Sequence, residues 1–217
     1  DKTNYYISAG YYDQKGILLG SDFKRYTTRF NLDNQLKSWL KVGVSSNITR
    51  TTQNVTLADA AESTIWWAAL QSPLVSVGGY TYYQDNPVAT ASNRGNKTTI
   101  TQVFGSIYAD IQILKGLSLR NEISYTLGLR NNQAYQYAAN VGTRTLQSQL
   151  ADSRNNSYYY AVRNYFNYNK LINQKHNISL TAGHEAQYSY WEEVSGKKVD
   201  LQNNILDLSA GSTDKTT

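Results

Sequence analysis

The sequence predicts an all-β protein, an antiparallel up-and-down sheet of about seven long strands that forms an arc of a transmembrane β-barrel. Three observations predict it. Apolar and polar residues alternate with a period of two over long stretches. Short turns alternate with long connections along the chain, and tyrosines gather near the strand ends. Transmembrane β-barrels combine long alternating strands, short turns at one end with long loops at the other, and aromatic residues near the strand ends.

The composition excludes several other classes. The chain has 217 residues with 19 Tyr, 2 Pro and no Cys, a net charge of +5 and a mean hydropathy of −0.56. No stretch approaches the roughly 18 consecutive apolar residues of a transmembrane helix. Without cysteine, neither disulfides nor cysteine-based zinc or iron–sulfur sites can form. The positive charges are scattered along the chain, which favours a polar surface over nucleic-acid binding.

We expect strands near residues 4–13, 23–33, 38–51, 98–114, 117–130, 158–170 and 176–194. In the stretch 117–130, Leu117, Leu119 and Ile123 share one phase, while Arg120 and Glu122 occupy the other. Strands of soluble sheets mostly have about 5–6 residues, whereas a tilted strand needs about 9–11 to cross a bilayer. The length of these segments therefore indicates membrane-spanning strands.

Charged side chains mark the phase that faces away from lipid. An arginine in contact with lipid at the bilayer midplane costs about 2–4 kcal/mol. We therefore expect six charged residues to face the barrel lumen: Arg29, Asp110, Arg120, Glu122, Arg163 and Glu185.

The connections differ in length from one end of the strands to the other. Short connections at 33–37, 115–116 and 171–175 alternate with long ones at 14–22, 52–97 and 131–157 and a tail from residue 196. Transmembrane barrels have short periplasmic turns and long extracellular loops. The long connections are therefore expected to be extracellular.

The connection 52–97 is the candidate for ligand or partner binding. Its run 57–70 places Leu57, Ala61 and Ile65 at helical spacing, and Pro73 follows, so we expect a short helix in this loop. Aromatic rings offer flat faces on which sugars can stack, although the two tryptophans could instead anchor the helix to the barrel rim. The candidate residues are Trp66, Trp67, Tyr80, Tyr82 and Tyr83.

Seven strands are too few for a closed single-chain barrel, since bacterial barrels have an even number of strands from 8 upwards. An open sheet in lipid would leave two edges of unsatisfied backbone groups. We therefore expect residues 1–217 to be a partial barrel domain, with the remaining strands supplied by a longer chain.

The opening of the chain resembles a known family. It reads YISAGYYDQKGI over residues 6–17 and GSDFKRYTTRFNLD over residues 20–33. These blocks are similar to the early barrel of the SusC/RagA family of TonB-linked outer-membrane proteins. Weaker likeness follows at residues 69–73, 103–119 and 183–185, so that the resemblance covers essentially the whole chain.

The resemblance implies the architecture and function of a large transporter. It implies an outer-membrane barrel of the 22-stranded type, filled by a plug domain that lies outside this sequence. Such a barrel imports oligosaccharides or peptides with energy from the TonB complex, which it contacts through an N-terminal region also outside this sequence. The resemblance further implies a SusD-like surface lipoprotein that acts as a lid.

The residues favour no enzymatic chemistry, and we expect no cofactor. His176 and His184 have no third ligand at metal-binding spacing, and Glu192 and Glu193 are adjacent in a strand and so point to opposite faces. Two further classes remain as alternatives. A soluble β-sandwich that binds carbohydrate would explain the aromatic residues but neither the strand lengths nor the turn asymmetry, and a nucleic-acid binder would need its basic residues on one strand face.

Overall fold

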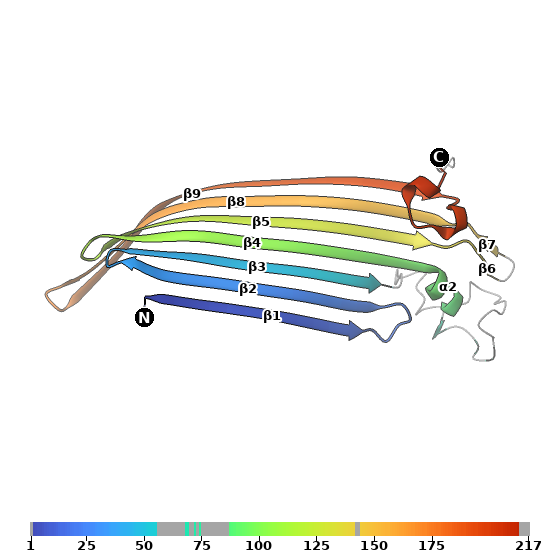
Figure 1. The fold of residues 1–217 in the computed structure, drawn as a ribbon, viewed down its shortest axis with the longest axis horizontal. Helices are drawn as coiled ribbons and strands as arrows, with labels where there is room; N and C mark the ends of the chain where they lie inside the picture. Colours follow the sequence, from blue (N-terminus) through green and yellow to red (C-terminus); the bar gives the residue numbers. More distant parts are fainter. Residues whose placement is uncertain are drawn as a thin grey trace.

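The main feature of the computed structural model is an antiparallel sheet of seven strands, paired in chain order with no crossover (Figure 1). The structure describes residues 2–55, 68–69, 72, 74, 87–141 and 144–212. The strands are β1 (Thr3–Lys15), β2 (Asp22–Lys37), β3 (Leu40–Val55), β4 (Arg94–Leu114), β5 (Leu117–Gln136), β8 (Gln149–Ile172) and β9 (His176–Val199). The predicted up-and-down sheet of seven strands is confirmed.

The strands are longer than the sequence predicts. Strands β8 and β9 have 24 residues each, and β4 has 21. Strand β5 continues to Gln136, which pairs with Gln149 of β8. The sequence instead predicts that the first of these strands ends at residue 130 and that the second begins at residue 158. Both faces of the sheet are polar in this region, so the alternation that marks a half-apolar strand is lost although the backbone ladder continues.

The two ends of the sheet differ. Tight turns after β2, β4 and β8 lie at one end, which we call the turn end (Figure 1). At the opposite end, the loop end, lie the turn 16–21, helix α2 (Pro87–Asn93), the hairpin β6 (Ala139–Val141) and β7 (Arg144–Leu146), and the 3₁₀ turns η1 (Gln202–Asn204) and η2 (Leu208–Ala210). At the turn end Gly116 has a φ of 90°, and a Cβ there would collide with the Asn169 carbonyl oxygen, so only glycine fits.

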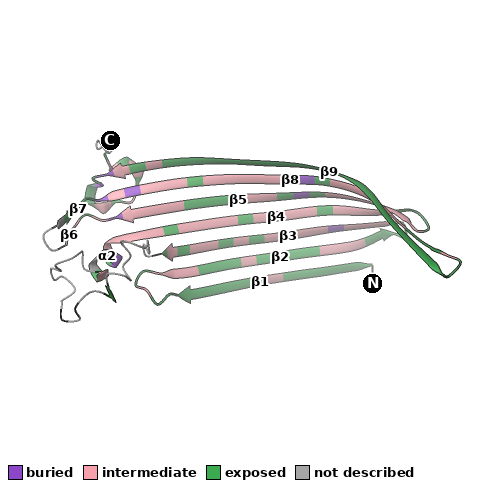
Figure 2. Cartoon of the chain, turned by 180° about the vertical axis from the view of Figure 1, so that it is seen from behind, coloured by how far each residue is buried: buried purple, intermediate pink, exposed green. Residues whose placement is uncertain are grey.

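The sheet has almost no hydrophobic core. Among the described residues the buried apolar side chains are Ala91, Leu150, Ala161, Val199 and Leu201. Meanwhile Tyr5 is 74% exposed, Ile107 62% and Ile123 60%, and exposed or half-buried residues dominate every strand (Figure 2). A water-soluble sheet covers its apolar face with a second layer.

The described strands do not form the second sheet that a sandwich requires. Outside the main sheet they comprise only the pair β6 and β7, of three residues each. In the described ranges, no helix is long and apolar enough to span a bilayer.

The outer strands β1 and β9 each pair on one side only within the described part of the chain. Strand β9 is exposed over nearly its whole length. Long unpaired edges are templates for further strands, and they are not tolerated in lipid. Within the described residues the sheet is therefore open at both edges, which is consistent with an arc of a larger barrel.

Candidate functional site

The register of the sheet sorts the side chains into two faces. One row across the sheet joins Asp33, Gly43, Tyr108, Glu122, Arg163 and Glu185, each opposite the next on neighbouring strands. Residues in one row share a face, and so do residues two apart in one strand. We call the face that carries Glu122 the polar face and the face that carries Ile123 the apolar face.

Charged side chains on the polar face form a chain of ion pairs across β4, β5, β8 and β9. Arg163 lies between two carboxylates, with Nε 3.0 Å from Glu185 and Nη1 3.4 Å from Glu122. Arg120 likewise approaches Glu122 at 3.5 Å and Asp110 at 3.4 Å. Each inner charge therefore serves two partners.

The chain of contacts continues across β3 to β2 through Tyr108. Its hydroxyl donates a hydrogen bond to Asp33, which also pairs with Lys41 at 3.5 Å. The Arg120 guanidinium lies 3.9 Å from the centre of the Tyr108 ring, within cation–π range. We call the whole set the ionic ladder: Asp33, Lys41, Tyr108, Asp110, Arg120, Glu122, Arg163 and Glu185.

Gly43 allows the ladder to cross β3. A Cβ at this position would collide with the Tyr108 ring and lie 2.6 Å from Asp33 Oδ1. The missing side chain is what lets the ring reach across β3 to β2.

The ladder is nearly neutral, with three cations and four carboxylates. Its side chains are half-buried, from 20% exposed at Glu122 to 45% at Glu185. Isolated pairs of this exposure contribute about 0–1 kcal/mol each. The ladder is thus suited to fixing strand register rather than to attracting a charged ligand.

The register places the six charged residues singled out from the sequence on the polar face. Five of them lie in the ladder, whereas Arg29 lies on the polar face nearer the loop end, where its row partners are Ser8 and Asn47. Sequence reasoning missed Asp33, Lys41 and Tyr108 because their contacts depend on cross-strand register. A glycine in the polar phase of a strand was the available signal. The aromatic candidates Trp66, Trp67, Tyr80, Tyr82 and Tyr83 lie outside the described residues.

The loop-end half of the polar face has a different charge balance. Its charged residues within the described strands are Arg25, Arg29, Arg94, Arg130, Lys197 and Glu193. This half therefore carries five cations and one carboxylate, whereas the ladder nearer the turn end balances its charges.

Two hollows open on this half of the polar face. One, of about 420 Å³, is lined by the β1 segment 8–12 and by Arg25, Thr27, Arg29 and Thr49. The other, of about 360 Å³, is lined by residues of β4, β5, β8 and β9 that include Arg94, Ala134, Ala151 and Lys197.

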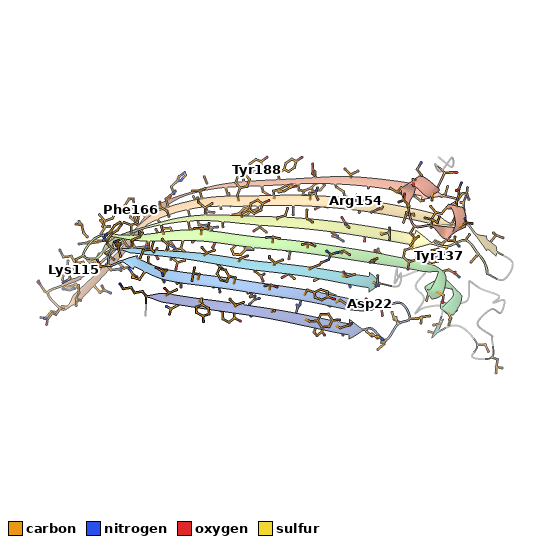
Figure 3. All side chains as sticks on the ribbon, viewed as in Figure 1. Asp22, Lys115, Tyr137, Arg154, Phe166 and Tyr188 are labelled. Atoms are coloured by element: carbon orange, nitrogen blue, oxygen red, sulfur yellow. The ribbon has the colours of Figure 1, made fainter. Side chains whose placement is uncertain are left out.

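Tyrosines gather on the apolar face. Ring pairs cross neighbouring strands at Tyr11–Tyr26, with centroids 5.0 Å apart, and at Tyr160–Tyr188, also 5.0 Å. Figure 3 shows Tyr188 projecting from β9, with Phe166 nearer the turn end. Trp191 occupies the opposite phase to Tyr188 and so lies on the polar face.

The described residues contain no group of three or more His, Cys, Asp or Glu side chains that could hold a metal ion.

Comparison with known proteins gives sequence and structural relatives, although no protein-family model matches the chain. The chain is 25% identical to TonB-dependent receptor P39 of Formosa agariphila over 242 aligned positions, which cover all of this chain and 22% of that receptor. It is 23% identical to TonB-dependent receptor P3 of the same organism, over 86% of this chain and 20% of the receptor. The chain thus spans about a fifth of the length of these curated relatives.

Among solved structures, the RagAB peptide transporter matches 99% of this chain with a TM-score of 0.83, 21% identity and 26% of its own chain covered. The RagAB peptide importer in its open–open state gives a TM-score of 0.84 at the same identity. The sequence and structural relatives together support a segment like those of SusC/RagA-type TonB-dependent transporters.

Proposed function

We propose that this chain is an arc of the barrel domain of an outer-membrane, TonB-dependent nutrient importer of the SusC/RagA type. The single-layer sheet carries this proposal, because in the half nearer the turn end one face is exposed and apolar while the other carries the ionic ladder. In the proposal, the apolar face contacts lipid and the polar face lines the lumen. The loop end is extracellular and the turn end periplasmic, in keeping with the short periplasmic turns of such barrels.

The placement of charge supports this orientation. The ionic ladder lies wholly on the polar face, so the opposite orientation would expose three cations and four carboxylates to hydrocarbon. On the apolar face Ile107 and Ile123 lie side by side in one row and are about 60% exposed. Lipid is the environment that stabilises such a face without a second protein layer.

The cargo in this proposal is an oligosaccharide or a peptide. Support comes from relatives that are named TonB-dependent receptors and from structural neighbours described as a peptide transporter. A SusD-like surface lipoprotein covers the extracellular mouth, and the TonB complex supplies energy through a region outside this sequence. The aromatic residues of 52–97 contact either the cargo or the lipoprotein. The chain performs no chemistry on its cargo and acts as part of a transporter rather than an enzyme.

Cell fractionation with surface labelling tests this proposal. An epitope placed between residues 56 and 86 of the complete receptor chain should be labelled by antibody on intact cells. The receptor should sediment with the outer membrane and co-purify with a lipoprotein. Cargo uptake by the same cells should stop when TonB is deleted.

A matched epitope at 115–116, in a tight turn of the opposite end, is the control and should be labelled only after the outer membrane is opened. Labelling of both sites on intact cells, or recovery of the receptor in the soluble fraction, would contradict the proposal. In the soluble case the carbohydrate-binding sandwich would become the better hypothesis.

A further inference from the structure

We propose that the hollow on the polar face of β1, β2 and β3 is an oxyanion-binding subsite, in which Arg25 and Arg29 bind carboxylate or sulfate groups of the cargo. This inference rests on the proposed function and narrows its cargo to anionic oligomers. It uses a different part of the polar face from the ionic ladder.

Among the described residues, the two arginines differ from the cations of the ladder in having no acidic partner. Lys41, Arg120 and Arg163 each lie within 4 Å of a carboxylate. Within the described part of the chain, neither Arg25 nor Arg29 forms such an ion pair, and both are exposed. A guanidinium presents five donors in a planar fork that matches carboxylate and sulfate oxygens.

The hollow places the two arginines on either side of one space. They are four residues apart on the same face of β2, which separates their Cα atoms by about 13 Å. Between them, the row Gly10–Thr27–Thr49 crosses three strands. No atom lies within 4 Å of where a Gly10 Cβ would be, so the floor of the hollow stays open.

The remaining lining residues suit a hydroxylated or amide-bearing chain. Thr27 and Thr49 provide hydroxyl groups that donate or accept hydrogen bonds. The Tyr12 ring lies beside the Arg25 guanidinium, with 5.7 Å from Cζ to the ring centre, and this contact restrains the arginine near the hollow. Tyr12 also donates its hydroxyl to Gln14 Oε1 at 2.8 Å, which fixes the ring in turn.

The charge of the surrounding surface supports an anionic ligand. Within the described strands, the loop-end half of the polar face carries Arg94, Arg130 and Lys197 in addition to the two arginines, and one carboxylate, Glu193. Like charges on one wall of a narrow lumen raise the local concentration of oppositely charged solutes. The second hollow extends the same surface from β4 to β9. At its β4 side the Arg94 Nε is buried without a hydrogen-bond partner among the described residues.

Carboxylate groups of acidic peptides and the carboxylate or sulfate groups of acidic glycans share this recognition chemistry. Two probes separate these sources, a hexaglutamate peptide and a sulfated hexasaccharide. Maltohexaose serves as the neutral probe and hexalysine as the cationic one. Affinities are measured by isothermal titration calorimetry on the complete receptor chain in detergent, at low and at raised salt.

The test compares two variants with matched controls. The double variant Arg25→Gln/Arg29→Gln removes both charges, and Arg50→Gln removes one exposed arginine from the apolar phase of β3. Gly10→Leu fills the hollow without altering charge. Gly105→Leu is its control, since that glycine also has open space at its Cβ but lies on the apolar face.

We expect at least one anionic probe to bind, with affinity that falls as salt rises. The double variant should weaken it about 10-fold or more, because a lost charge-assisted hydrogen bond changes affinity on this scale. Gly10→Leu should weaken it similarly, and both controls should stay within about twofold of wild type. The stronger of the two anionic probes identifies the source of the oxyanion.

Three results would overturn the inference. Neither anionic probe binds, or the double variant binds the probes as tightly as wild type does, or the double variant and Gly10→Leu both bind as tightly as their controls Arg50→Gln and Gly105→Leu. Unchanged affinity with a lowered melting temperature would show that the two arginines contact another part of the receptor instead. The proposed function is tested independently, by surface labelling and by the loss of uptake when TonB is deleted. A receptor that passes those tests but binds no oxyanion would contradict only the present inference.

Discussion

The two halves of the polar face carry similar charged residues but differ in how these residues are paired. Near the turn end, cations and carboxylates alternate from strand to strand. Arg163, for example, forms ion pairs with both Glu122 and Glu185, and every charged residue of the ladder has an oppositely charged neighbour. Nearer the loop end, Arg25 and Arg29 share the same face but have no acidic partner among the described residues. An arginine in a sheet is thus either part of the scaffold or available to a ligand, and the opposite residue on the neighbouring strand decides which.

This difference separates stability from binding. A paired, half-buried charge contributes to the folded barrel and offers little to a solute, because its field is cancelled nearby. An unpaired, exposed arginine contributes little to folding but keeps its hydrogen-bonding capacity for an incoming group. Substitutions in the ladder should therefore alter stability, whereas those in the arginine hollow should alter binding.

The largest effect is expected from Gly43→Val. The added side chain would displace the Tyr108 ring and with it the contacts to Asp33 and Arg120. Overpacking of this kind costs about 1–3 kcal/mol. Urea unfolding of the receptor in lipid vesicles measures the loss. Gly105→Val, which meets open space on the apolar face, is the control, and an equal loss in both variants would show that Gly43 has no special place in the ladder.

Tyr108→Phe removes one hydrogen bond while keeping the ring over Gly43. The hydroxyl donates to Asp33 across β3, and loss of a partly solvated bond of this kind costs about 1 kcal/mol. The same unfolding assay should show this loss with no change in affinity for the anionic probes. A change in probe affinity without a change in stability would reverse the roles assigned to the two halves.

Comparing Arg163→Met with Arg29→Met tests whether an arginine with acidic partners contributes more to the free energy of unfolding than an arginine without them. Loss of Arg163 leaves Glu122 and Glu185 without their shared cation, which we expect to cost about 0.5–1 kcal/mol. Loss of Arg29 should change unfolding by less than about 0.5 kcal/mol. Raising the salt concentration should shrink the difference, and equal costs at low salt would contradict the comparison.

The smallest effect concerns Asp207, a carboxylate outside the strands that is held by neutral donors. Its Oδ1 accepts hydrogen bonds from the Ser209 hydroxyl at 2.7 Å and the Ser209 amide at 2.8 Å. These bonds, with the hydroxyl first, lower the pKa of Asp207. The cap of η2 is therefore complete above the ordinary aspartate pKa of about 3.9 and is lost as the pH falls through the lowered folded-state value.

Amide exchange at Ser209 between acid and neutral pH measures this cap. Protection should decrease only in acid in the wild type, and Asp207→Asn should remove the pH dependence while keeping an acceptor. Protection that is constant with pH in the wild type would show that the carboxylate does not hold the turn.

The sequence predicts the sheet well because its signal is local. Alternation in 117–130 reports directly which side chains share a face, and five of the six charged residues singled out by phase meet in the ladder. The extra lengths of β5 and β8 were missed because both of their faces become polar beyond residue 130.

Contacts between strands are not local and were harder to predict. The approach of Tyr108 to Asp33 spans 75 residues of sequence and depends on the register of three strands. The division between paired and unpaired arginines depends on the same register, so the sequence pattern alone treats Arg29 and Arg163 alike.

In the proposed orientation one face of the sheet contacts lipid and the other contacts water, and a cysteine scan along β4 distinguishes the two environments. The 217 residues contain no cysteine, so each introduced spin label is unique within them. Labels at positions 102–107 of the receptor in lipid vesicles are read by their collision with oxygen, which concentrates in lipid, and with a water-soluble nickel chelate. We expect oxygen access at Val103, Gly105 and Ile107 and nickel access at Gln102, Phe104 and Ser106. Nickel access at all six positions would contradict this orientation.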